Sequence, residues 1–511
     1  MPSTPSRPPG SLRPRELGAA MAALATAAVV HAQPRVIYAD ASNTAGAHTG
    51  ASWQTAYRDL QDALLAARID PNRATRGVEV RIAQGIYTPD RASGDRYASF
   101  VLNSAVTLMG GFAGLKGSNP DERDPRQFVS VLSGDLSRND GPAFTNYADN
   151  SRTIVSADTA DGSAALDGLE ISGGSAVTPV ISKASSLPSA GLTLRGCTIT
   201  RNLGGSGRVL HLRNSTLISC RIVDNRADNS AILFGSGNTL DACEIRGNRT
   251  TGQPIVSIVK FFSLGATDRF RRCLIADNIS GAGGTLGAFE SAMTIELSGC
   301  TLAGNAGLLP AVYSQLGLVR LRNCIIARNT TFSQPMNATQ VAVQNASLLD
   351  MSGPTLVDNG AAGFAFLTGG TPAVSVLSGD PMFVSPNGPD QDPLLWEDNN
   401  FHLRPGSPAI DAADSSAPGF LPTDFEGRPL YDDPAAANAG FGPFAYADIG
   451  ASEFNGQLCP LDFDRSGTVS VADIFAFLNA WLASDPEADF NGGGLAVQDI
   501  FDFVNAWLRG C

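Results

Sequence analysis

The chain has 511 residues, more than one ordinary globular core holds, which indicates several domains or a repeat architecture. Glycine (54) and proline (31) make up about a sixth of it, a turn-rich composition below the range of disordered or collagen-like chains. A formal net charge of -13 argues against nucleic-acid or polybasic membrane binding, and four histidines leave little material for a zinc site.

The first 32 residues predict a secretory signal peptide. Arg7, Arg13 and Arg15 precede an apolar run over 17–30, and a small-x-small pattern ends at Ala32. The apolar run, about 14 residues, is too short to cross a bilayer as a helix. We therefore expect residues 1–32 to be removed and the mature chain to be secreted, extracellular or attached to a cell surface, without a transmembrane segment.

Residues 33–100 predict an N-terminal α/β cap. A helix is expected over 56–68, because Tyr57, Leu60, Leu64 and Ala67 share one helical face between strand-like segments at 36–38 and 78–83. An open solenoid needs such a cap, since its first coil would otherwise expose unpaired strand edges.

Residues 101–403 carry a repeat of 23 to 30 residues. In six copies a cysteine precedes an asparagine by five residues: Cys197, Cys220, Cys243, Cys273, Cys300 and Cys324, with Asn202, Asn225, Asn248, Asn278, Asn305 and Asn329, and Asn359 continues the series. The cysteine position and the position two residues later are apolar, which is typical of a strand with one buried face. We expect the asparagines at turns, because asparagine tolerates a left-handed backbone, and we expect their amides to form a ladder.

This repeat is too short for a βαβ crossover with two further strands, and it lacks the fixed leucines of a leucine-rich repeat. It predicts an all-β solenoid, a right-handed parallel β-helix of about 12 coils stacked about 4.8 Å apart. The six cysteines could form a disulfide framework or a buried column. Stacked Cβ atoms about 4.8 Å apart suit a disulfide poorly, so the spacing favours packing.

The repeat does not continue into residues 404–455, which are richer in proline and glycine. We expect a C-terminal cap and linker there. Strings along the chain resemble bacterial secreted, pectin-lyase-like β-helix proteins with an interchangeable anchoring tail, the choice-of-anchor proteins. These strings are SW and DLQDAL within 38–65, GIYTP at 85–89, GGF at 110–112, LSGD at 132–135, SPAID at 407–411 and DIGASEF at 448–454. The resemblance implies a fold and export, and leaves activity undefined.

Residues 456–511 contain two similar loop–helix units. The first loop has oxygen donors at the spacing of an EF-hand calcium loop: Asp462, Asp464, Ser466, Thr468 through its carbonyl, Ser470 and Asp473. The second loop offers the weaker set Asp489, Asn491 and Asp499, because Gly493 stands at position 5 and Asp499 arrives one residue early for position 12. Matching apolar faces predict that the two helices pack together in a small all-α, calcium-binding domain.

The duplicated units, flanked by Cys459 and Cys511, resemble a dockerin of the type that ends in Gly-Cys. The resemblance implies a cohesin-like receptor, contacted through loop positions 10 and 11: Val471 and Ala472, then Val497 and Gln498. A bridge between Cys459 and Cys511 would stabilise the domain by about 4 kcal/mol in the chain-entropy model. The alternative is a calcium-stabilised end domain that binds nothing.

The sequence leaves the catalytic residues unknown. Asp224 and Asp277, each one residue before a ladder asparagine, are two coils apart, near 10 Å, just beyond the separation of an inverting glycosidase. Three lysines in the chain make a lysine base improbable. Two functions remain: a non-catalytic surface protein whose rod displays or binds glycan while its tail docks it, and a surface-docked polysaccharide lyase or glycoside hydrolase. We favour the first.

Overall fold

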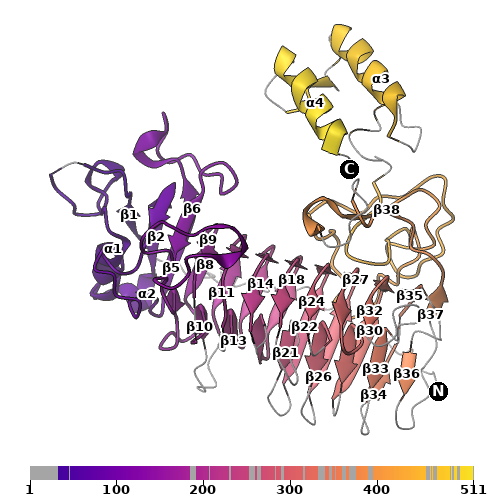
Figure 1. Ribbon diagram of the computed structural model, residues 1–511, viewed down its shortest axis with the longest axis horizontal. Coiled ribbons are helices and arrows are strands. Elements are labelled where there is room, and N and C mark those ends of the chain that lie inside the picture. Colours follow the sequence, from indigo (N-terminus) through magenta and orange to yellow (C-terminus); the bar gives the residue numbers. More distant parts are fainter. Residues whose placement is uncertain are drawn as a thin grey trace, which may run out of the picture.

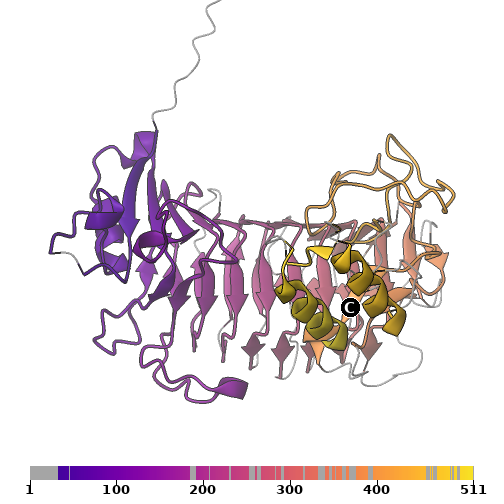
Figure 2. The same cartoon turned by 90° about the horizontal axis from the view of Figure 1, so that it is seen from above.

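The structure is a computed structural model, and it forms a long rod with additional segments at both ends (Figures 1 and 2). It describes residues 33–44, 46–175, 177–183, 191–205, 208–228, 232–251, 259–261, 266–281, 284–288, 293–314, 317–331, 340–343, 348–351, 353–358, 364–366, 376–388, 395–455, 461, 463, 469–483, 485, 488–491 and 495–509. The predicted signal peptide, residues 1–32, lies outside these ranges. Within them, no helix combines the length and apolarity needed to span a bilayer.

Three long parallel sheets form the sides of the rod. Sheet A contains, in spatial order, β1 (Arg35–Ala39), β2 (Val78–Ala83), β5 (Val106–Phe112), β8 (Ala165–Asp167), β11 (Thr193–Arg195), β14 (Thr216–Ile218), β18 (Thr239–Asp241), β22 (Thr267–Arg271), β26 (Thr294–Ser298), β30 (Leu318–Arg322) and β34 (Leu348–Asp350). Sheet B contains β3 (Gly85–Tyr87), β6 (Ser130–Ser133), β9 (Glu170–Ser172), β12 (Thr198–Thr200), β15 (Arg221–Val223), β19 (Glu244–Arg246), β23 (Leu274–Ala276), β27 (Thr301–Ala303), β31 (Cys324–Ala327), β35 (Thr355–Val357) and β37 (Val376–Ser378).

Sheet C forms the third side, and a short fourth sheet follows the asparagine turns. Sheet C contains β4 (Phe100–Val101), β7 (Val155–Ser156), β10 (Ile181–Lys183), β13 (Leu210–Arg213), β17 (Leu233–Ser236), β21 (Val259–Phe261), β25 (Leu286–Ala288), β29 (Val312–Ser314), β33 (Val341–Val343) and β36 (Phe364–Phe366). The fourth sheet contains β16 (Arg226–Ala227), β20 (Arg249–Thr250), β24 (Ile279–Ser280), β28 (Ala306–Gly307) and β32 (Thr330–Thr331).

The predicted cysteine column is confirmed. All six repeat cysteines are free and fully buried, and they belong to the same core as the apolar positions two residues later. Their thiols bond to backbone carbonyls, as Cys273 Sγ does to Leu240 O at 3.3 Å and Cys300 Sγ to Phe270 O at 3.3 Å. Burial raises the pKa of the Cys273 thiol, so these cysteines behave as small core side chains.

The predicted asparagine ladder is also confirmed, but the asparagines do not have the left-handed backbone conformation that we expected. Amide-to-amide bonds of 2.8 to 3.0 Å join Asn202, Asn225, Asn248, Asn278, Asn305 and Asn329 in order. The left-handed residue of each turn is the one before the asparagine, such as Asp224 at φ 50° and Asp277 at φ 55°. Our expectation of a left-handed asparagine was therefore wrong; the asparagine is selected for its side-chain bonds. Asn359 lies outside the described residues.

The sheets begin earlier than the predicted boundary at residue 101. In the expected cap region, β1 and β2 already pair in parallel, and β2, β3 and β4 form a complete coil that pairs with the next through β5, β6 and β7. The helix in this region is α1 (Leu60–Arg68), which begins where Asp59 accepts the Gln61 N–H at 2.8 Å, later than the predicted residue 56. The short 3-10 turn Trp53–Thr55 precedes α1. A one-turn helix, α2 (Arg73–Arg76), follows it, and two further 3-10 turns, Gly114–Lys116 and Pro142–Phe144, come later in the chain.

The C-terminal segment covers a side of the rod as well as following its last coil. The last parallel strand, β37, ends at Ser378, and β38 (Phe383–Ser385) pairs antiparallel with β39 (Asn400–Leu403) after the 3-10 turn Trp396–Asp398. Apolar residues of 383–454 pack on outward-facing side chains of sheet B, in a core that includes Leu274, Ile325 and Leu356. We expected an end cap; the segment lies laterally because these outward positions are apolar.

Two helices complete the chain: α3 (Val471–Leu482) and α4 (Val497–Arg509). Phe477 and Phe503 stack between them, with ring centroids 4.0 Å apart and planes 8° apart. Each tryptophan bonds to the residue before the other helix: Trp481 Nε1 donates to Ala496 O at 2.9 Å, and Trp507 Nε1 donates to Ser470 O at 3.1 Å. The two units are therefore related by internal symmetry, as the duplicated sequence predicted.

Candidate functional site

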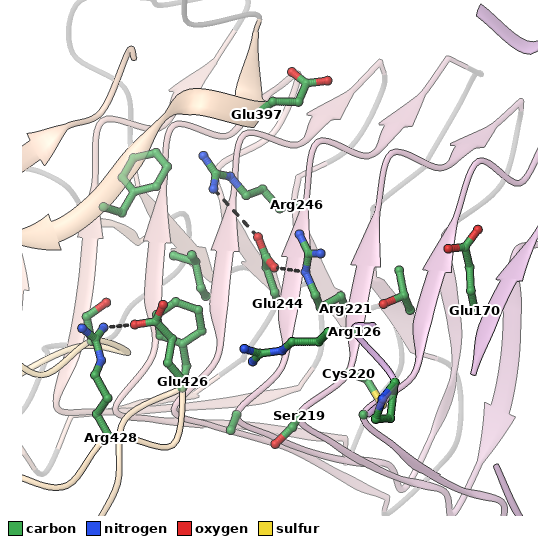
Figure 3. A pocket seen from close by; sticks show the side chains of 18 of the residues that line it. Arg126, Glu170, Ser219, Cys220, Arg221, Glu244, Arg246, Glu397, Glu426 and Arg428 are labelled. Carbon is green, nitrogen blue, oxygen red and sulfur yellow. Dashed lines mark hydrogen bonds and ion pairs between the residues drawn. The ribbon is translucent and has the colours of Figure 1, made fainter. Parts of the chain in front are cut away.

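A groove of about 1130 Å³ lies over the outward face of sheet B (Figure 3). Its walls come from two parts of the chain far apart in sequence. Residues 124–129 form the wall toward the N-terminal end, and residues 397–402 with 425–428 form the wall toward the C-terminal covering segment. Its floor is made of side chains from successive coils, so the groove follows the stacking direction of the rod.

The floor uses the first residue of each sheet B strand, which points outward because the second residue is buried. Parallel pairing aligns these residues from coil to coil, in steps of about 4.8 Å. In order they are Glu170, Thr198, Arg221, Glu244 and Leu274. The series changes from polar to apolar where the covering segment begins.

A chain of ion pairs holds the middle of the floor in place. Arg221 Nε donates to Glu244 Oε2 at 2.7 Å, and Glu244 lies 3.8 Å from Arg246 Nη1. Arg246 Nε in turn donates to Asp277 Oδ2 at 2.8 Å. The Arg221 side chain is 54% exposed while that of Glu244 is 13% exposed, so the guanidinium presents its remaining N–H groups to the groove.

Arg246 also fastens the covering segment to the rod. Its Nη2 donates to Asn399 O at 2.6 Å, and its guanidinium lies over the rings of Trp396 and Phe401, at 5.6 and 5.5 Å from their centroids. Trp396 lies against Gly247, where a Cβ would stand 2.4 Å from the ring. Glycine at this left-handed turn position, φ 62°, therefore provides the space for the indole.

The two aspartates weighed from sequence as a catalytic pair have different surroundings. Asp277 is 7% exposed and accepts from Arg246 and from Asn399 Nδ2, at 3.0 Å; burial raises its pKa to about 6. Asp224 is more exposed, and burial with the negative charge of Glu397 raises its pKa. Because Asp277 is covered by Arg246 and Asn399, the structure does not present the two carboxylates to one substrate.

The wall near the covering segment contains a neutral histidine. Burial, and then the positive charge of Arg428, lower the pKa of His402 to about 4. His402 Nδ1 lies 2.7 Å from Asn400 Oδ1, and Arg428 Nη2 lies 2.7 Å from His402 Nε2. His402 Nε2 also lies 2.8 Å from Glu426 Oε2, so this nitrogen stands between the guanidinium of Arg428 and the carboxylate of Glu426. Arg428 also pairs with Asp424, at 3.0 Å, and with Glu426, so His402 serves to position the wall.

The predicted calcium ligands fall partly outside the described residues. Asp462, Asp464, Ser466 and Thr468 of the first loop, and both Cys459 and Cys511, lie outside them. Of the first set the structure places Ser470 and Asp473 at the start of α3: Ser470 Oγ accepts the Ala472 N–H at 3.2 Å, and Asp473 Oδ2 accepts the Ser470 N–H at 2.6 Å. In the described parts of the chain, no three His, Cys, Asp or Glu side chains are placed to hold a metal ion.

The second loop brings Asn491 and Asp499 together. Asp499 Oδ1 accepts the Asn491 N–H at 3.2 Å, and Asp499 Oδ2 accepts the Ala496 N–H at 2.7 Å. Asp499 is thus the third residue of α4, as Asp473 is of α3, and both carboxylates are fully buried. The residue missing from the second loop falls between Phe490 and Ala496, so Asp499 takes the position equivalent to Asp473 despite the shorter loop.

The predicted partner-binding residues lie in the first turns of the two helices. Val471 and Val497 are 56% and 58% exposed, and Ala472 and Gln498 are exposed as well. The apolar surface extends one turn further, to Phe475 and Phe501, which are 62% and 58% exposed. The matching apolar positions of the two helices were expected to pack together, and for these two phenylalanines that expectation is wrong.

The groove itself was missed from the sequence, although a signal for it exists. The position directly after each repeat cysteine reads Thr198, Arg221, Glu244, Leu274, Thr301 and Ile325. The position before each asparagine, where Asp224 and Asp277 stand, does not face the groove floor. After Glu244 the series has no charged residue: Leu274 and Ile325 are apolar, and Thr301 accepts the Ala451 N–H of the covering segment at 2.9 Å. This loss of charge marks where the floor of the groove ends and the covered face begins, but the wall residues 397–402 have no such signal.

A model of the family described as "Right handed beta helix region" matches this chain twice, over residues 146–313 and 189–377. These ranges contain the floor of the groove, the cysteine column and the asparagine ladder. The fold is a right-handed parallel β-helix. No curated protein matches the chain.

Solved structures give weaker likenesses to this β-helix. Pectate lyase Pel9A is 14% identical, with a TM-score of 0.37 over 83% of this chain and 97% of that chain. The PL6 family alginate lyase AlyGC is 10% identical, with a TM-score of 0.22 over 73% of this chain and 60% of that chain. The catalytic domain of a GH87 α-1,3-glucanase is 11% identical, with a TM-score of 0.22 over 63% and 66%. At these scores the likenesses carry no argument about activity.

Proposed function

We propose that this β-helix binds an extended glycan in the groove over sheet B, without cleaving it. The observation that carries the proposal is the floor: four polar side chains, Glu170 to Glu244, follow one another on adjacent coils between two walls. A regular row of donors and acceptors matches the repeating hydroxyl groups of a sugar chain. An open groove admits a chain that extends beyond its ends.

We infer that the groove does not cleave glycans because its carboxylates are not arranged for glycosidase chemistry. Glycosidase chemistry needs two carboxyl groups facing the same bond, one of them able to give up a proton. Here Glu244 is ion-paired to Arg221, and Asp277 is covered by Arg246 and Asn399. Neither of these two is free to act on a sugar, and the less engaged Glu170 and Glu397 lie on opposite sides of the groove (Figure 3). The described lining residues also include no lysine that could serve as the base of a lyase.

For the tail we propose calcium binding and docking. The donors of the first loop are carboxylate, hydroxyl and carbonyl oxygens, the ligands that Ca²⁺ prefers, and Asp473 and Asp499 are buried at the two loop–helix junctions. Bound calcium would hold each loop against its helix. Exposed Val471, Val497, Phe475 and Phe501 then offer apolar contacts to a cohesin-like receptor on a cell surface. The predicted signal peptide would export the chain to that location.

A large side chain on the floor tests the glycan site. Thr198→Trp would place an indole in the middle of the groove, whereas Thr216→Trp places the same group on the outward face of sheet A, one coil on. With calorimetry against oligosaccharides of a polysaccharide panel, we expect Thr198→Trp to weaken binding more than about tenfold, ~1.4 kcal/mol, and Thr216→Trp to leave it unchanged. Equal effects of the two variants would place the site elsewhere.

A parallel assay tests the absence of cleavage. The mature protein is incubated with acidic and neutral polysaccharides in the presence of calcium, and the mixture is followed for new reducing ends and unsaturated products. We expect neither. Turnover that is lost in Thr198→Trp would identify the groove as the active site of a lyase or hydrolase instead.

A further inference from the structure

The groove carries more negative than positive charge. Its lining has six carboxylates, Asp124, Glu170, Glu244, Glu397, Asp398 and Glu426, against four arginines, Arg126, Arg221, Arg246 and Arg428. Because His402 is neutral, these groups leave a balance of about two negative charges in the groove at pH 7. The chain as a whole has a formal charge of -13, so its long-range field has the same sign.

Most of the arginines are already engaged by carboxylates. Arg221 pairs with Glu244, Arg246 with Asp277, and Arg428 with Asp424 and Glu426. Among the described residues Arg126 is the lining arginine without an ion pair. An anionic sugar would therefore meet one uncommitted guanidinium, and it would have to compete with protein carboxylates for the others.

The carboxylates on the two sides of the groove are less engaged. Glu397, at the tip of one wall, makes no ion pair within the described residues, and Glu170 pairs only with Arg201, whose side chain is 62% exposed. Two like charges at close range repel each other in water, and they repel more strongly at a protein surface, where the effective dielectric is lower. A polymer with one carboxylate on every sugar would meet this repulsion repeatedly along the groove.

Uncharged sugar hydroxyls are not repelled in this way, and they form hydrogen bonds with both the carboxylates and the guanidinium groups. A hydroxyl donates to Glu170, Glu244 or Glu397 and accepts from Arg221 or Thr198. Hydrogen bonds to charged groups are the stronger ones, and the ion pairs keep these groups in fixed positions before a ligand arrives. The floor is thus suited to a polyhydroxylic chain without charges of its own.

Building on the glycan-binding role proposed above, we infer that the groove takes neutral glycans and rejects polymers that carry a carboxylate or sulfate on each sugar. The test measures calorimetric affinities of the mature full-length protein for hexasaccharides. The neutral ligands come from xylan, mannan and β-glucan, and the anionic ligand is hexagalacturonate, each at low salt with calcium and with a chelator. At least one neutral ligand is expected to bind about tenfold tighter than hexagalacturonate.

The outcomes separate the two proposals. Hexagalacturonate binding as tightly as the neutral ligands, with or without calcium, would overturn the inference and leave glycan binding intact. If none of the ligands binds, the proposed function fails, and the inference fails with it.

A charge reversal tests the cause of the selectivity. Glu397→Lys and Asp95→Lys change the net charge of the chain equally, but Asp95 is exposed on a loop outside the groove lining. We expect the affinity for hexagalacturonate to rise about tenfold in Glu397→Lys and to stay near that of the wild type in Asp95→Lys. An equal response of both variants, or no response, would show that the charge of the groove does not determine the choice of ligand.

Discussion

The outward residue at the start of each sheet B strand decides what the rod can contact. Arg221 and Glu244 stay open to the groove, while Leu274, Ile325 and Leu356 at the same strand face are covered by the C-terminal segment. The inward residues are nearly constant, since each coil must fit the coil above it. The side chains that line the groove therefore stand at the positions that differ most from coil to coil.

A buried aspartate gives a prediction at the residue scale. Asp268 continues a second ladder, in which Asn238 N donates to Asp268 Oδ1 at 2.8 Å and Ser215 N donates to Asn238 Oδ1 at 3.0 Å. Burial raises the pKa of Asp268 to about 7. Since the folded pKa lies above the unfolded value, the folded state holds the proton longer, and stability falls as the pH rises from about 4 to 7.

We expect Asp268→Asn to remove this loss, because the amide keeps the acceptor oxygen and carries no charge. The variant should unfold at a higher temperature than the wild type at pH 8, by the equivalent of ~4 kcal/mol at most, and at nearly the same temperature at pH 4. Melting curves at the two pH values check this. A variant that is equally or less stable at pH 8 would mean that Asp268 is not held protonated.

At the scale of the elements, the asparagine ladder is the main polar support of the turns. Asn248 makes bonds in both directions: it accepts from Asn225 Nδ2 at 3.0 Å, and it donates to Asn278 Oδ1 at 3.0 Å and to Ile222 O at 2.7 Å. Each bond satisfies a group that is out of reach of water. Removal of one asparagine leaves partners on two neighbouring coils without a bond.

We therefore expect Asn248→Ala to lower the free energy of unfolding by ~3 kcal/mol, because buried unsatisfied groups each cost about 1–3 kcal/mol. Denaturant unfolding measures it. Thr216→Ala, on the outward face of sheet A, is the control and should change stability by less than ~0.5 kcal/mol. A loss in Asn248→Ala as small as in the control would show that the ladder contributes little.

The two terminal helices offer a matched test of calcium binding. Asp473 and Asp499 make the same backbone bond at the start of their helices, so Asp473→Asn and Asp499→Asn remove one negative charge from equivalent positions while each keeps an acceptor oxygen for that bond. In calcium titrations of the full chain we expect Asp473→Asn to weaken the tighter site more than about tenfold, and Asp499→Asn to affect only the weaker one. Unchanged titrations in both variants would reject the proposed ligands.

For the whole molecule, the sequence was sufficient to predict what repeats. Cysteine and asparagine recur because stacked coils place them in the same surroundings, so the column, the ladder and the parallel sheets followed from their spacing. The left-handed turn position was misplaced by one residue, because asparagine both tolerates a left-handed backbone and forms ladders, and here its side-chain bonds alone account for its position. The relation between the two helices followed from their duplication.

The site could not be predicted because contacts between distant segments make it. Arg246 lies 153 residues from Asn399, its partner in the wall, and no periodicity links the two. The covering segment packs on the outward face of sheet B and forms a second core with it. In the sequence, only the apolar residues at outward positions after Glu244 indicate this core. A groove bounded by a loop near residue 124 and a turn near residue 397 becomes visible only when the coils are stacked.

The most direct test of the glycan site is a crystal structure of the mature protein with a bound oligosaccharide, the neutral ligand of highest affinity in the calorimetric panel. We predict sugar density over Thr198 and Arg221, between residues 124–129 and 397–402, with hydroxyls bonded to Glu170 or Glu244. Sugar bound on sheet A, on sheet C or at the terminal helices, with an empty groove, would contradict the proposal.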